Sequence, residues 1–193
     1  IFLMKVFSTP FDNVFLIDTK IHDNERSAFS ERYNQKELHQ AIGKKIVFCQ
    51  DNQANSVKGV IRGLHYQLPP FSQTKLVEVL QGSVLDIIVD IRKGSPTFGQ
   101  HFSQELNDVN RLQLLIPRGF AHGYITLSER SIFQYKVDSD YHAESEGSIA
   151  PDDPSLGIDW GLPKSQWIQS HKDKQHPGIN HASLFDFKAD LYD

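Results

Sequence analysis

Apolar and polar residues alternate with a period of two over much of the chain, which is the spacing of a half-buried β-strand. The run KLVEVLQGSVLDIIVDIR, residues 75–92, shows this spacing most clearly. Its second half places four apolar residues on one strand face, namely Leu85, Ile87, Val89 and Ile91. The opposite face receives Asp86, Ile88 and Asp90. The Gln81-Gly82 step between the two halves predicts a hairpin turn.

Comparable runs recur along the chain and are separated by short clusters of Gly, Pro, Asn and Asp. They are KIVFCQ (45–50), RLQLLIP (111–117) and SIFQYKVDSDY (131–141). Many short strands without helices between them are typical of a sandwich or a barrel. The sequence therefore predicts an all-β fold, such as a jelly-roll barrel, with short helices at its periphery.

One longer helix is predicted in ERYNQKELHQAIG, residues 31–43. Asn34 is a favourable N-cap, and Glu37 stands three residues later, as in a capping box. Tyr33 and Leu38 have the spacing of a hydrophobic staple. Gly43 suits the left-handed residue that ends a helix.

The chain has 193 residues, of which 39% are hydrophobic, and this is enough for one domain with its own core. We expect a single domain over residues 1–193, in which the polar tail, from about 155–193, wraps the barrel. Met4 follows three apolar residues. We therefore expect native numbering to begin at Met4 and residues 1–3 to be left from cloning.

Charge and cysteine content limit the classes of ligand and the cellular compartment that the sequence favours. The net charge of −4 leaves no broad basic face for a nucleic acid and favours a small anionic ligand held by a few arginines and lysines. No apolar run approaches the roughly 20 residues that span a bilayer. The single cysteine, Cys49, rules out an internal disulfide, so we predict a cytoplasmic protein with Cys49 as a small core residue.

The stretch GVIRGLHYQ, residues 59–67, sets a basic residue, a glycine and a histidine inside a predicted strand. In a regular strand, Arg62 and His65 point to opposite faces. A bulge at Gly63 adds one residue and turns both side chains toward one cavity. The simpler alternative is a buried structural histidine and a surface arginine.

Four other positions have plain structural explanations when each is taken alone. His122, in IPRGFAHGYITL, is then a turn histidine. Tyr135 is then a core tyrosine, although its strand face suggests that it points into the barrel. Lys75 and Asp173 are then solvated charges.

A metal site is not expected. Jelly-roll barrels often bind a metal through two closely spaced histidines, whereas this chain has no His-x-His pair. The tail contains three histidines spaced by fives, which fits neither a helix face nor a usual ligand pattern. We expect these to be solvated: His171, His176 and His181.

Five segments, taken in order, carry a family resemblance: GVIRGLHYQ, KLVEVLQGSVLDIIVDIRKGSPTFGQ, LLIPRGFAHGYITLSE, FQYKVDSDY and DDPSLGIDW. From about Asp12 to Asp173 the chain resembles the dTDP-4-dehydrorhamnose 3,5-epimerases, the nucleotide-sugar epimerases of rhamnose synthesis. The resemblance implies a cupin barrel without metal or cofactor, and a homodimer that exchanges N-terminal strands. It also implies an isomerase that inverts C3 and C5 of a dTDP-linked 4-keto-6-deoxyhexose.

The resemblance assigns a role to each matching residue. His65 is the implied base, and Asp173 orients it. Lys75 stabilises the enolate oxygen, and Tyr135 is the acid on the other face of the sugar. Two arginines, Arg62 and Arg26, are the implied diphosphate ligands. Further matches around the nucleotide or sugar are Phe29, Glu31, Gln50, His122 and Tyr141.

Three positions depart from the family pattern. Arg26-Ser27-Ala28-Phe29 replaces an arginine-glycine-phenylalanine-phenylalanine run, Gln53-Ala54 replaces a histidine-serine pair, and Pro151 replaces an aromatic residue. All three lie outside the implied acid-base set. One alternative keeps that set: an epimerase for C3 or C5 alone, or one that acts on another nucleotide-linked 4-keto deoxysugar. A sugar-nucleotide-binding barrel without activity is disfavoured because base, orienting carboxylate and acid are all present. A metal-dependent oxygenase is disfavoured by the missing ligands.

Overall fold

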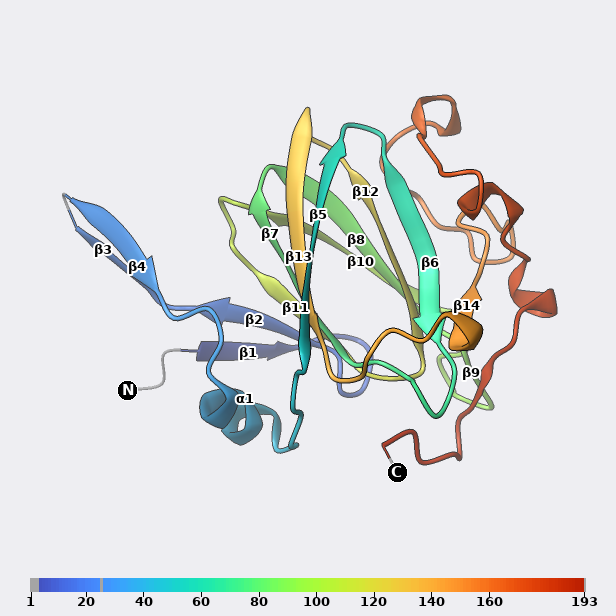
Figure 1. Cartoon of the computed structure of the whole chain (residues 1–193), viewed down its shortest axis with the longest axis horizontal. Coiled ribbons are helices and arrows are strands. Elements are labelled where there is room, and N and C mark those ends of the chain that lie inside the picture. Colours follow the sequence, from blue (N-terminus) through green and yellow to red (C-terminus); the bar gives the residue numbers. More distant parts are fainter. Residues whose placement is uncertain (1–3, 25, 193) are drawn as a thin grey trace.

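The structure is a computed structural model that describes residues 4–24 and 26–192. The expectation about residues 1–3 lies outside this part of the chain. Two antiparallel sheets form the body of the molecule (Figure 1). The first sheet has the strand order β1 (Met4–Ser8), β2 (Phe15–Thr19), β11 (Gln113–Ile116), β7 (Lys75–Gln81), β13 (Arg130–Val137) and β5 (Gln50–Val57). The second has the order β10 (His101–Asn107), β8 (Ser83–Asp90), β12 (Phe120–Thr126), β6 (Ile61–Gln67) and β14 (Glu146–Ser148).

The remaining elements are short and peripheral. Two further strand pairs are β3 (Ile21–Asn24) with β4 (Ser27–Ser30), and β15 (Phe185–Asp186) with β9 (Arg92–Lys93). The helices are α1 (Gln35–Ile42) and four 3-10 turns, η1 (Ala143–Ser145), η2 (Lys164–Gln166), η3 (Asp173–Gln175) and η4 (Ile179–His181). The predicted all-β jelly-roll barrel with short peripheral helices is confirmed.

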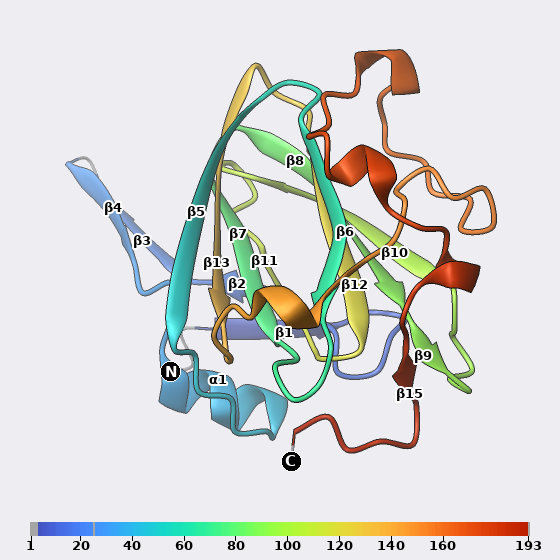
Figure 2. The same cartoon turned by 45° about the vertical axis from the view of Figure 1, so that its right-hand side comes forward.

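The two sheets face each other around an apolar core (Figure 2). Both sheets contribute buried side chains, among them Val77, Phe133, Ile88, Leu106 and Tyr124. The alternation predicted for residues 85–91 is also confirmed, because Ile88 packs in this core while Ile87 and Val89 pack on the outer face of the second sheet.

The C-terminal segment covers that outer face. Trp160, Ile179 and Phe185 are buried in the same cluster as Ile87 and Val89. Burial of each such side chain contributes roughly 1.5–3 kcal/mol before the entropy of ordering is subtracted. The tail that carries Asp173 is therefore fixed to the barrel by apolar packing.

The turn predicted at Gln81-Gly82 has a different role from the expected one. β7 lies in the first sheet and β8 in the second, so Gly82 carries the chain across from one sheet to the other and forms no hairpin. Gly82 has a φ of 78°, and a Cβ there would lie 2.1 Å from the carbonyl oxygen of Arg130. Local alternation marks a turn, but it does not say which sheet the next strand joins.

Helix α1 forms as predicted. The backbone amide of Glu37 donates to Asn34 Oδ1 at 3.1 Å, and Gly43 ends the helix with a φ of 69°. The expected strand at 45–50 is wrong, because β5 begins only at Gln50. Cys49 is exposed, which corrects the prediction of a core cysteine. Its neighbour Ile46 is buried beneath α1 instead.

Strands β3 and β4 form a hairpin that stands away from the barrel in both views (Figures 1 and 2). Two apolar side chains on it are exposed, Phe29 by 68% and Ile21 by 37%.

A separate question is whether any helix could cross a bilayer. Within residues 4–24 and 26–192, no helix has the length and apolar character needed to cross a membrane.

Candidate active site

Strand β6 contains the predicted bulge. His65 pairs with His122 and Arg62 pairs with Tyr124, so Gly63 and Leu64 together face the single residue Gly123 of β12. Gly63 has a φ of 116°, which is readily adopted only by glycine. A Cβ there would lie 2.6 Å from the Cα of Gly123, so the two strands approach too closely for a side chain.

The bulge shifts the alternation of the strand by one residue. Ile61, Leu64 and Tyr66 all pack in the outer cluster, while Arg62 and His65 line one cavity inside the barrel. The prediction that Gly63 turns both side chains to the same side is confirmed. Arg62 remains exposed while it lines the cavity, and His65 is half-buried there and not buried in the core.

The cavity has a volume of about 270 Å³. Six of the candidate residues line it: Arg62, His65, Lys75, His122, Tyr135 and Asp173. They come from both sheets and from the tail, so residues far apart in the sequence meet here.

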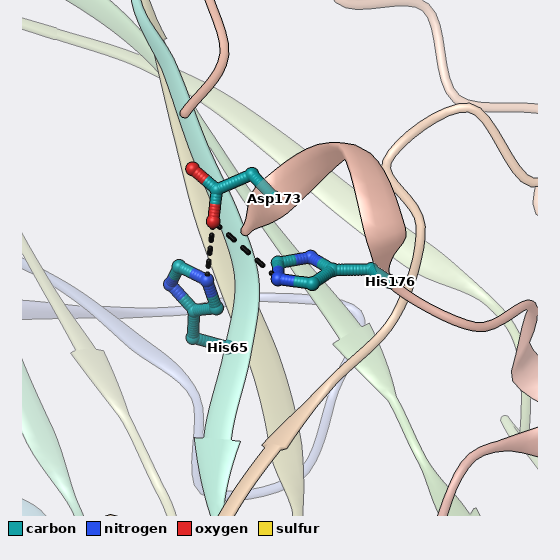
Figure 3. Close-up of side chains that lie close together, drawn as sticks. All are labelled: His65, Asp173 and His176. Carbon is teal, nitrogen blue, oxygen red and sulfur yellow. Dashed lines mark hydrogen bonds and ion pairs between the residues drawn. The ribbon is translucent and has the colours of Figure 1, made fainter. Parts of the chain in front are cut away.

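His65 is hydrogen-bonded to Asp173, since its Nε2 lies 3.0 Å from Asp173 Oδ1 (Figure 3). Burial raises the pKa of Asp173, but hydrogen bonds from His65 and Ser170 outweigh this effect and hold the pKa below its ordinary value. An ionised carboxylate only accepts hydrogen bonds, so Nε2 of His65 is the donor. The Nδ1 atom of a neutral His65 then keeps a free lone pair and is the basic atom of the ring.

The prediction that His176 is solvated is wrong. Its side chain is only 4% exposed, and its Nε2 lies 3.4 Å from the same Asp173 Oδ1. The rings of His176 and His65 meet edge to face with centroids 5.0 Å apart (Figure 3). In a 3-10 turn, residues three apart lie above one another, and this places His176 beside Asp173. The five-residue spacing concealed that relation, whereas His171 and His181 are exposed as expected.

A second histidine–carboxylate pair lies deeper in the barrel. His122 Nε2 is 2.9 Å from Asp86 Oδ2, and both residues are buried. Burial lowers the pKa of His122, while the Asp86 carboxylate opposes this shift. His122 is a strand residue of β12 and not a turn residue. Asp86 was missed by the sequence reasoning, although its place on the strand face opposite Ile87 and Val89 was a signal that it points inward.

Lys75 and Tyr135 approach the cavity from the first sheet, opposite the sheet that carries His65. Burial lowers the pKa of Lys75 to about 8, with the carboxylates of Asp86 and Glu146 opposing this shift. Burial raises the pKa of Tyr135, with Arg62 opposing. Tyr135 therefore holds its proton at neutral pH, and it lies across the cavity from His65.

The cavity rim includes two charged residues that the sequence reasoning missed. Lys172 Nζ donates to Glu146 Oε2 at 2.6 Å, and both residues line the cavity. The Tyr141 hydroxyl donates to the same Oε2 at 2.9 Å, so Tyr141 lies beside the rim. This ion pair ties the tail next to Asp173 to strand β14.

Five predicted ligand-binding residues are not among the described residues that line the cavity: Tyr141, which lies beside the rim, and four residues from the first 50 of the chain. Arg26 and Phe29 belong to the projecting β3–β4 hairpin. Glu31 accepts a hydrogen bond from Asn34, and Gln50 donates to Asn52. Within one chain, the structure assembles the predicted acid-base set and Arg62, but it does not bring the N-terminal candidates to the same cavity.

A jelly-roll barrel whose cavity holds a histidine–carboxylate pair, a lysine and a facing tyrosine belongs to the class of barrel enzymes that transfer protons on a bound small molecule. The model of the dTDP-4-dehydrorhamnose 3,5-epimerase family matches residues 8–181. The chain therefore belongs to this family.

Individual relatives agree with this placement. The dTDP-4-dehydrorhamnose 3,5-epimerase of Salmonella typhimurium is 45% identical over 183 residues, which cover 94% of this chain and 99% of that protein. The crystal structure of the Legionella pneumophila dTDP-6-deoxy-D-glucose-3,5-epimerase in complex with dTDP-4-keto-L-rhamnose has a TM-score of 0.92 and 43% identity, and covers 96% of this chain and 100% of that one. A 3′-monoepimerase from Streptomyces bikiniensis, in complex with dTDP-quinovose, has a TM-score of 0.82 and 28% identity, with 89% and 86% covered.

Proposed function

We propose that this protein inverts C3 and C5 of dTDP-4-dehydro-6-deoxy-D-glucose to form dTDP-4-dehydro-L-rhamnose. One observation carries the proposal: the His65–Asp173 pair and Tyr135 enter one cavity from opposite sheets. Inversion at carbon needs this arrangement, because the proton leaves one face of the sugar and returns to the other.

The side chains divide the reaction between them. Nδ1 of His65 removes the proton from the carbon next to the C4 ketone, and Asp173 stabilises the imidazolium that forms. The electron pair moves onto the ketone oxygen, where the Lys75 ammonium balances the developing negative charge. Tyr135 then supplies a proton to the opposite face of the carbon. Arg62 provides a guanidinium for the diphosphate.

The charge on Lys75 gives the reaction an alkaline limit. The ammonium is the active form and its pKa is lowered to about 8, so we expect the rate to fall as the pH rises through about 8. The decrease should approach about tenfold per pH unit, as for a single ionisation. Turnover measured from pH 6 to 10 tests this. The Lys75→Arg variant keeps its charge over this range, so the same decrease in that variant would refute the assignment.

The reaction itself is tested with dTDP-4-keto-6-deoxyglucose in deuterium oxide. We expect deuterium at both C3 and C5, and a 4-keto reductase should convert the product to dTDP-L-rhamnose, identified by NMR. Exchange and inversion at one carbon alone would instead indicate a mono-epimerase, the activity named for the Streptomyces bikiniensis neighbour. Exchange at neither carbon would leave only a sugar-nucleotide-binding barrel.

The assembly that fits the β3–β4 hairpin is a homodimer in which each hairpin reaches the cavity of the other subunit. The hairpin stands clear of its own barrel and carries Arg26 and an exposed Phe29 (Figure 1). A two-fold dimer would place these residues at the partner's cavity, where the family resemblance assigns them. The same arrangement explains why Arg26 and Phe29 do not line the cavity of their own chain.

Mixing two defective variants tests the exchange of hairpins. We expect His65→Ala and Arg26→Ala each to be impaired alone, and their mixture to recover activity after dissociation and reassociation. Half of the dimers are then mixed, and each contains one intact cavity served by one intact hairpin, so recovery should reach about a quarter of the wild-type rate. Without exchange, both cavities of a mixed dimer remain defective, and absence of recovery would contradict the proposal.

A further inference from the structure

We propose that His65, Asp173 and His176 form a binding site for a zinc-type divalent cation. The three residues offer two imidazole nitrogens and one carboxylate oxygen that lie within 4.8 Å of one another. Among the described residues, no other group of three histidine, cysteine or acidic side chains was found at this spacing. His176 adds a third possible ligand atom to those of His65 and Asp173.

The distances fit a tetrahedral ion. Zinc binds imidazole nitrogen and carboxylate oxygen at about 2.0–2.2 Å, so neighbouring ligand atoms of a tetrahedral site stand about 3.4 Å apart. Asp173 Oδ1 lies 3.0 Å from His65 Nε2 and 3.4 Å from His176 Nε2. Figure 3 shows one nitrogen of each ring turned toward that same oxygen. The two nitrogens lie within 4.8 Å of each other, and rotation of the rings would bring them to the spacing of the third edge.

His176 is placed as a ligand without a competing hydrogen bond. Its side chain is 4% exposed, and neither ring nitrogen makes a hydrogen bond of good geometry. Its polar neighbours include the Asp173 carboxylate and the backbone of Gly63. A buried imidazole with unsatisfied nitrogens gains a strong partner when a cation enters.

The ligand set and its charge select the type of cation. Two imidazoles and one carboxylate suit Zn²⁺, Co²⁺ or Ni²⁺ better than Mg²⁺ or Ca²⁺, which prefer all-oxygen sites. Lys172, which precedes Asp173 in the chain, is paired with Glu146, so its charge is already balanced. His65 is partly exposed to the cavity, which leaves a side of the site open for a water molecule as the fourth ligand.

Occupation of this site would stop proton transfer without filling the substrate cavity. A neutral imidazole that binds a cation through Nε2 carries its proton on Nδ1. The lone pair that His65 needs as a base is then lost, although its side chain stays in place. This inhibition rests on the proposed function, whereas the binding itself does not, so the two are measured separately.

Binding is tested by titrating the purified protein with Zn²⁺ in a calorimeter and with Co²⁺ in an absorption spectrometer. We expect one equivalent bound per chain, with the intense visible bands of tetrahedral Co²⁺. In His176→Phe, which keeps a buried ring, affinity should fall by at least about tenfold, since even an outer-shell change at such sites costs this much. His176→Gln is the second variant, and retained dTDP binding shows that each variant is folded.

The matched control is His171→Ala combined with His181→Ala, which removes two exposed histidines from the same tail. We expect the control to bind Zn²⁺ as the wild type does. Wild-type affinity in His176→Phe and His176→Gln, or a loss in the control alone, would overturn the proposed site.

Inhibition is measured as the rate of deuterium exchange with and without Zn²⁺, compared within each variant. We expect Zn²⁺ to suppress exchange in the wild type and in the control, a chelator to restore it, and dTDP affinity to stay the same. In His176→Phe, the Zn²⁺ concentration that halves the rate should rise by the factor lost in binding. Binding at the site with full exchange activity would refute the base role of His65 and leave the cation site standing.

Discussion

Replacing His65 with alanine is expected to abolish exchange of the protons at both C3 and C5. The Nε2 of His65 is hydrogen-bonded to the buried Asp173, and the His65 side chain lines the cavity and is 31% exposed. One base on one wall serves both carbons next to the ketone. Removal of a general base lowers a rate by about 10²–10⁴. The loss should appear in exchange as well as in product formation, because both require removal of a proton.

The measurement is the NMR signal of the C3 and C5 protons during incubation in deuterium oxide. Asp173→Asn is a second test, for which we expect an exchange rate between those of the wild type and His65→Ala. The asparagine amide donates a hydrogen bond to Nε2, so the ring proton moves to Nδ1, the atom that must accept the proton from the sugar. The His181→Ala variant, in the exposed tail, is the matched control and should exchange as the wild type does. Equal exchange in His65→Ala and in this control would refute the assignment of the base.

The cavity was largely predictable because its signals are local. The close approach of Gly63 to Gly123 needs a glycine at a bulge, and a bulge reverses the direction of the side chains that follow it. The glycine inside the predicted strand therefore indicated a bulge that turns Arg62 and His65 to one side, although a buried structural histidine and a surface arginine stayed open as an alternative. The family resemblance added Asp173, Lys75 and Tyr135, which lie on other strands or in the tail and which no local pattern connects to His65.

Two of the predictions that failed depend on long-range relations. The step at Gln81-Gly82 is a turn by any local measure, yet the next strand joins the other sheet, and pairing partners are set by packing across the whole barrel. His176 was read as solvated because the tail is polar. His176 is buried because Trp160, Ile179 and Phe185 hold the tail against the outer face of the second sheet by apolar packing. A polar sequence around a few apolar anchors can still bury a histidine.

Arg62 and Arg26 differ in how each can contact a ligand. Arg62 lines the cavity because the bulge in its own strand aims it there. Arg26 lies on a hairpin that projects from the barrel, so its contribution depends on how subunits meet. A single chain therefore contains the proposed acid-base residues, and the proposed dimer would complete the site that holds the nucleotide.

The Tyr135→Phe variant should separate proton removal from inversion. His65 and Asp173 remain intact in it, so we expect deuterium still to enter at the carbons from the face of the base. The acid on the opposite wall is gone, so inversion should slow by about 10²–10⁴, the usual contribution of a positioned acid. Product analysis after trapping with a 4-keto reductase would then give labelled sugar with its original configuration.

Tyr124→Phe is the matched control, since it removes a hydroxyl from the same cavity on the sheet that carries His65. Inversion should persist in this control. If both variants lose inversion equally, the effect belongs to the packing of the cavity and Tyr135 is not the acid. If Tyr135→Phe loses exchange as completely as His65→Ala, the division into a base on one sheet and an acid on the other is wrong.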